Sequence, residues 1–106
     1  MKELSKIEET ILLAIWKLKD DAYGVNIKKQ IKESANREYL YSTLYSTLEQ
    51  LVRKGLIHKK FGEPTAVRGG KRKVFFTITD EGLNALKSAY KRQQSVWFGI
   101  SEKSFG

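Results

Sequence analysis

One short cationic stretch with two adjacent glycines carries residue types suited to binding phosphate. It lies in the run AVRGGKRKVFFTIT, residues 66–79, where the β-branched and aromatic residues typical of a strand follow directly. Glycine lets the backbone approach a ligand closely, and arginine and lysine bind phosphate oxygens. The pattern predicts a hairpin tip that contacts a phosphate backbone; the alternative is a loop that only promotes solubility. The residues concerned are Arg68, Gly69, Gly70, Lys71 and Arg72.

A second set of candidate binding residues occupies one side of a helix expected over residues 41–54. Apolar residues recur at helical spacing on the other side, which predicts that this side is buried. Glutamine pairs with adenine edges, and serine and threonine contact bases or phosphates. The candidate groove residues are Ser42, Thr43, Tyr45, Ser46 and Gln50, and the alternative is an ordinary solvated face. Glu49 on the same side is expected to repel phosphates unless it accepts from a cytosine amine or pairs with Arg53.

Residue types for catalysis or metal binding are scarce in this sequence. His58 is its single histidine, and it contains no cysteine, so a protein zinc site and a Ser-His-Asp arrangement are not expected. The glycine pair lacks the spacing of a phosphate-binding loop of nucleotide hydrolases. We therefore expect no enzyme, no metal and no cofactor.

The balance of charge favours an anionic partner. The 106 residues carry a formal net charge of +8, and nucleic acid is the commonest partner of so basic a domain. The alternative is a soluble basic protein with no such partner. The longest apolar run, residues 11–16, is too short to span a bilayer, and no signal-peptide pattern precedes it. We expect a cytoplasmic protein that does not enter the membrane.

The order of predicted elements indicates how these residues are held. Ser5 and Glu8 form a capping-box pattern at the start of a first helix. Gly55 is placed to end the third helix in a left-handed conformation, and Thr79 is an N-cap for the last helix. The predicted elements are a helix from Ser5, a helix over 25–35, a helix over 41–54, strands within 56–63 and 73–79, and a helix from residue 80. Three helices followed by a hairpin are typical of a winged helix-turn-helix, whose third helix enters the major groove.

Two apolar helix surfaces predict contact with a second subunit. The first helix is apolar nearly all round, and the last helix has an apolar seam at spacings of three and four. The predicted interface residues are Leu12, Trp16, Leu83, Leu86, Tyr90, Gln93 and Trp97. The alternatives are one more helix on the domain's own core, and a flat aromatic slot for a planar small molecule between subunits. We expect a DNA-binding domain over residues 1–79 and a dimerisation helix and tail over 80–106.

Three stretches together resemble the PadR family of bacterial transcriptional regulators. They are AYGVNI (22–27), YSTLYSTLEQLVRKGLI (41–57) and GEPTAVRGGKRKVFFTITDEG (62–82). The resemblance implies a winged-helix dimer that usually represses promoters, often until a small molecule binds. It implies that Tyr45 is the family's third-helix tyrosine that touches the DNA backbone, and that Tyr23 and Gly24 begin the second helix. The chain departs from the family at Ser42, where glycine is common, and in having a single helix after the hairpin.

The residues and the resemblance lead to one hypothesis and two alternatives. We expect a mainly α fold with a small β-hairpin (α+β): a winged helix-turn-helix with a C-terminal dimerisation helix. Its expected function is a homodimeric repressor that binds double-stranded DNA at an inverted repeat. The alternatives are a winged-helix adaptor that binds protein, and a dimer whose main task is to sense a small aromatic effector in an interfacial aromatic pocket.

Overall fold

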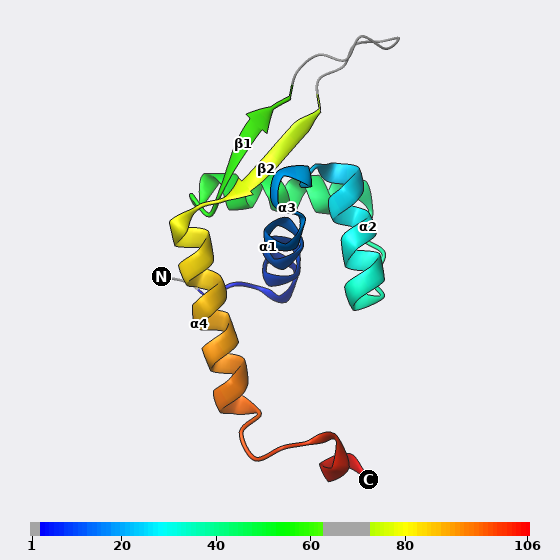
Figure 1. Cartoon of the computed structure of the whole chain (residues 1–106), viewed down its shortest axis with the longest axis vertical. Helices are drawn as coiled ribbons and strands as arrows, with labels where there is room; N and C mark the ends of the chain where they lie inside the picture. Colours follow the sequence, from blue (N-terminus) through cyan, green and yellow to red (C-terminus); the bar gives the residue numbers. More distant parts are fainter. Residues whose placement is uncertain (1–2, 63–72) are drawn as a thin grey trace.

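The computed structural model describes residues 3–62 and 73–106, and these residues form four α-helices and one antiparallel hairpin (Figure 1). The helices are α1 (Lys6–Leu18), α2 (Gly24–Ala35), α3 (Tyr41–Arg53) and α4 (Asp80–Val96); the strands are β1 (Ile57–Phe61) and β2 (Val74–Ile78). Two short 3-10 helices, η1 (Lys19–Asp21) and η2 (Glu102–Phe105), follow α1 and α4. The predicted α+β fold and the order of its elements are confirmed.

The helix ends form where the sequence predicts them. The Ser5 hydroxyl accepts from the Glu8 N–H at 3.3 Å, and the Glu8 carboxylate accepts from the Ser5 N–H at 2.9 Å. The Thr79 hydroxyl accepts from the Gly82 N–H at 3.0 Å at the start of α4. Gly55 follows α3 with a φ of 75°, which favours glycine. Side-chain caps therefore fix the starts of α1 and α4, and the backbone conformation of Gly55 fixes the end of α3.

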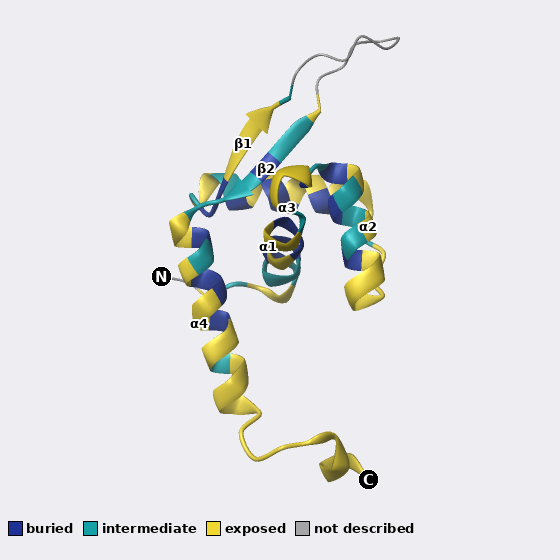
Figure 2. Ribbon diagram, viewed as in Figure 1, coloured by how far each residue is buried: buried dark blue, intermediate teal, exposed yellow. Residues whose placement is uncertain are grey.

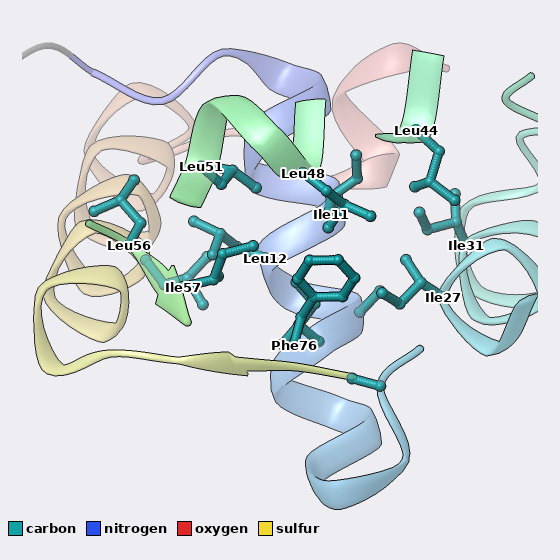
Figure 3. Packing of buried hydrophobic residues seen from close by; sticks show 14 of the residues in the cluster. Ile11, Leu12, Ile27, Ile31, Leu44, Leu48, Leu51, Leu56, Ile57 and Phe76 are labelled. Carbon is teal, nitrogen blue, oxygen red and sulfur yellow. The ribbon is translucent and has the colours of Figure 1, made fainter. Parts of the chain in front are cut away.

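The core surrounds α1, which contacts α2, α3, α4 and β2 (Figure 3). Its largest buried side chains are Ile11, Leu12, Ile15, Ile27, Ile31, Leu44, Leu48, Leu51, Ile57 and Phe76. Leu12 is 0% exposed, so the prediction that it contacts a second subunit is wrong: the chain's own core covers it. Leu86 also belongs to this core and is not available to a partner. The side of α1 that carries Leu12 is thus partly covered by the chain's own core.

The hairpin is a two-faced ribbon that joins the core at one end. Ile57 pairs with Ile78 and Lys59 with Phe76, so these four side chains share the face toward the helices. Lys60 pairs with Phe75 on the opposite face. Phe76 is buried, as its place in the alternating pattern predicts. Three helices with this projecting hairpin are the arrangement of a winged helix (Figure 1).

The C-terminal half of α4 extends away from the helical body (Figure 2). Ala85, Leu86 and Ala89 are buried, whereas Tyr90 and Val96 are exposed. The tail beyond α4 is exposed throughout. In the part of the chain that the structure describes, no helix combines the length and apolar character needed to cross a membrane.

Candidate nucleic-acid interface

The polar residues predicted on α3 lie together on its exposed surface. All five are exposed, while Leu44, Leu48 and Leu51 face the core. Thr47 is also buried, and its hydroxyl donates to the Thr43 carbonyl at 2.9 Å. The five exposed residues are Ser42, Thr43, Tyr45, Ser46 and Gln50. The wing residues predicted to bind phosphate, 68–72, lie outside the residues that the structure describes.

Two tyrosines and a lysine form a cluster at the N-terminal end of α3. The Tyr41 and Tyr45 rings stack with centroids 6.2 Å apart, and the Lys28 ammonium lies 4.2 Å from the Tyr41 centroid. Tyr41 shares the helical spacing of the buried leucines of α3, which predicts burial, but it is 44% exposed, because α3 begins there and its first turn extends past the core. Two phenol hydroxyls and an ammonium at one helix end are suited to phosphate oxygens.

Tyr45 is held against the first residue of α2. A Cβ atom built on Gly24 would overlap the Tyr45 hydroxyl. Gly24 is buried and begins α2 directly after Tyr23. The absence of a side chain at Gly24 therefore makes room for the Tyr45 ring.

Gln50 lies on the other flank of α3, toward α1. Its amide Nε2 donates to Glu8 Oε2 at 2.9 Å, and the Lys54 ammonium donates to the same oxygen at 2.5 Å. Glu8 is 2% exposed. Burial raises the pKa of Glu8, but the hydrogen bonds from Lys54 and Ser5 outweigh that effect and hold the pKa below its ordinary value. The Gln50 amide group, predicted to read adenine, is therefore engaged within the protein.

Glu49 has an unexpected partner on the hairpin. The Lys59 ammonium lies 2.5 Å from Glu49 Oε1, whereas the partner expected from the sequence is Arg53. This ion pair joins the exposed face of α3 to β1. The face of β1 that carries Lys59 follows from strand alternation, but the packing of that face against α3 is tertiary, so no local pattern predicts the pair.

The middle of β2 is packed onto the residues just before α2. The Phe76 N–H donates to the Ala22 carbonyl at 2.8 Å, and the Tyr23 and Phe75 rings meet edge to face with centroids 5.5 Å apart. The Lys73 ammonium lies 4.4 Å from the Tyr23 centroid. These contacts fix the direction in which the hairpin leaves the helices. Lys73 directly precedes β2, at the end of the ribbon opposite the Ile57–Ile78 pair.

The predicted interface residues divide into covered and exposed groups. Trp16 and Trp97 are 43% and 52% exposed, and Tyr90 and Gln93 are exposed as well. Leu83 is half-buried. The Lys19 ammonium lies 3.6 Å from the Trp16 ring centroid. An exposed apolar surface therefore runs along the distal half of α4.

An open hollow of about 420 Å³ lies between the N-terminal segment and α4. Leu4, Ala89, Gln93 and Trp97 are among its lining residues, and Trp16 does not line it. Among residues 3–62 and 73–106, no three histidine, cysteine or acidic side chains cluster to hold a metal.

Comparison with known proteins shows a match to one family over most of the chain. Residues 11–88 match the family model "Transcriptional regulator PadR-like family". No protein with a curated description matches the sequence.

Solved structures with the same fold extend the comparison. A PadR family transcription regulator from Clostridium difficile is 26% identical with a TM-score of 0.72, over 96% of this chain and all (100%) of that one. A transcriptional regulator from Clostridium thermocellum is also 26% identical with a TM-score of 0.72, over 86% and 85% of the two chains. A PadR-like transcription factor from Bacteroides fragilis, 23% identical with a TM-score of 0.67 over 90% and 89%, shares the fold.

Proposed function

Because this chain belongs to the PadR-like family of transcriptional regulators, we propose that it is a homodimeric repressor that binds an inverted-repeat operator. The observation that carries the proposal is the exposed polar face of α3, flanked by the Tyr41–Tyr45–Lys28 cluster. The net charge of +8 supports a polyanionic partner.

Within this proposal, the binding tasks are divided between elements. Ser42, Ser46 and Thr43 on α3 contact base edges, because short polar side chains on a groove helix reach donors and acceptors there. Tyr45 contacts phosphates and sets the register of the protein on the duplex. The wing residues Arg68, Gly69, Gly70, Lys71 and Arg72 contribute further phosphate contacts.

The proposed dimer uses the distal half of α4 and the exposed end of α1. Residues 1–79 then form the DNA-binding part, and residues 80–106 form the dimerisation helix and tail. The exposed Trp16, Tyr90 and Trp97 support this division, since such side chains are enriched in interfaces. A two-fold dimer matches a two-fold operator.

A response to a small aromatic effector is the second candidate function. The hollow beside Trp97 supports it, because an aromatic ring at its edge can stack on a planar molecule. DNA binding remains the primary function in this proposal, since the effector would act through it.

The experiment that tests the function is selection of bound duplexes from a random pool. We expect an inverted repeat with half-sites about 34 Å apart, or a multiple of that distance. If the dimer makes about 8 phosphate contacts, log K falls against log salt with a slope near −7. Replacing Arg68 and Lys71 with alanine should weaken all duplexes similarly and flatten that slope. A flat salt response and no selected duplex would instead favour the adaptor.

Gly24→Ala is expected to weaken DNA binding without unfolding the protein. The new methyl group would displace the Tyr45 hydroxyl, so we expect a loss of roughly tenfold in affinity for the selected duplex. Alanine favours a helix over glycine by up to about 1 kcal/mol, so the melting temperature should not fall greatly. Titration of a labelled duplex measures the affinity.

A double-mutant cycle provides the control for Gly24. In a Tyr45→Ala background, Gly24→Ala should have little further effect on affinity, because the displaced ring is already absent. Equal losses in both backgrounds would show that Gly24 acts independently of Tyr45.

A further inference from the structure

Glu49 presents an electrostatic problem for a helix that contacts DNA. It is the one acidic residue in α3, and it follows Ser42 and Ser46 along the exposed face. A free carboxylate there would face a phosphate backbone of the same sign, which lowers affinity for every duplex. Binding by this face therefore requires that the charge be compensated.

The register of the hairpin supplies the compensation. Lys59 shares the inner face of the ribbon with Ile57 and Phe76, and this face lies toward α3. Its ammonium reaches Glu49 Oε1 at 2.5 Å. The two side chains are 33% and 49% exposed, so the pair lies at the surface and not in the core.

Lys59 and Glu49 neutralise each other's charge. The hydrogen bond and charge of Lys59 hold the pKa of Glu49 below its ordinary value, with a smaller contribution from the charge of Arg53. The carboxylate thus stays ionised and directed toward β1. An exposed ion pair of this kind adds little to the stability of the fold, so we expect its effect on binding instead.

We propose that Lys59 is a positioning residue for DNA recognition, which neutralises Glu49 and holds it away from the duplex. The inference rests on the proposed DNA-binding function. Lys59 acts through Glu49 and makes no phosphate contact of its own. Strand β1 in this way reduces the negative charge on the exposed polar face of α3.

The test measures affinity for the duplex that the wild-type chain selects from a random pool. Lys59→Gln should lower affinity roughly tenfold, because it exposes an unpaired carboxylate to the phosphates. The double variant Lys59→Gln with Glu49→Gln should regain affinity to within about twofold of wild type. Lys59→Arg should keep affinity, since it retains the charge. The salt slope should stay unchanged in all three variants.

Lys60 offers a matched control on the neighbouring position. It has the same charge but lies on the opposite face of β1, paired with Phe75. Lys60→Gln should change affinity by less than about threefold and should show no coupling to Glu49→Gln. Melting temperatures of all variants should agree within about 3 °C, which separates the effect from unfolding.

Three results would overturn the inference, and they are distinguishable. A double variant as weak as Lys59→Gln, with a flatter salt slope, would make Lys59 a direct phosphate contact. A change of selected sequence in Glu49→Gln alone would make Glu49 a base-reading residue. A wild-type chain that selects no duplex would overturn the proposed function together with this inference.

Discussion

Replacing Glu8 with alanine is expected to lower the free energy of unfolding by about 3 kcal/mol, because it removes three hydrogen bonds of about 1 kcal/mol each, two of which join α1 to α3. Three donors lose their acceptor at once: the Ser5 N–H, the Gln50 amide and the Lys54 ammonium. One half of the capping box of α1 is lost with them, while the Ser5 hydroxyl still accepts from the N–H of residue 8. Urea denaturation followed by circular dichroism measures the change.

Glu9 is the matched control for this prediction. It is the next residue on α1, carries the same charge, and is paired loosely with Lys6 at 4.0 Å. Glu9→Ala should cost less than about 1 kcal/mol, because its pair with Lys6 is long and the Lys6 side chain is 82% exposed. If the two variants unfolded at the same urea concentration, the link between α1 and α3 would contribute nothing.

The same carboxylate predicts a dependence of stability on pH. Its pKa is lower in the folded than in the unfolded chain, so the unfolded chain binds a proton first as pH falls. The stabilisation is therefore complete well above the unfolded value of about 4.3, and it is lost as pH falls through the lower folded pKa. The difference in unfolding free energy between wild type and Glu8→Gln should shrink over that range.

Glu8 also illustrates what the sequence can and cannot predict about the fold. Its role in the capping box depends on Ser5, three residues away, and that pattern is legible from spacing alone. Its bonds to Gln50 and Lys54 join residues 42 and 46 positions apart, and no local pattern encodes them. Helix limits and buried stripes were predictable for the same reason as the cap, since short-range periodicity determines them.

The candidate site divides in a similar way. The exposed face of α3 follows from its helical period, so Ser42, Ser46 and Tyr45 were predictable. The contributions of Lys28 and Lys59 were not, because each depends on how another element packs against α3. The surface position of a residue follows from local pattern, whereas its partners follow from the tertiary arrangement.

Trp97→Asp is expected to convert the proposed dimer into monomers and to lower operator affinity at least about 100-fold. The Trp97 side chain is 52% exposed in one protomer and lies on the predicted seam of α4 with Tyr90 and Gln93. An aspartate buried without a partner in an apolar interface costs several kcal/mol, more than one helix seam is expected to supply. Separate monomers each bind one half-site and lose the gain of simultaneous binding. Sedimentation velocity gives the mass, and duplex titration gives the affinity.

Phe98→Asp is the control that separates loss of the specific seam on α4 from a general loss of exposed apolar surface. It is the neighbouring residue and is 89% exposed, but it lies off the seam of three- and four-residue spacings. Phe98→Asp should therefore leave the mass and the operator affinity within about threefold of wild type. The internal contact between Trp97 and Phe105, at 6.1 Å between centroids, is lost in Trp97→Asp and kept in Phe98→Asp. A Trp97→Asp protein that sediments as an intact dimer would show that the subunits associate through a surface other than the α4 seam. The spacing of the two half-sites would then have to follow from that other surface.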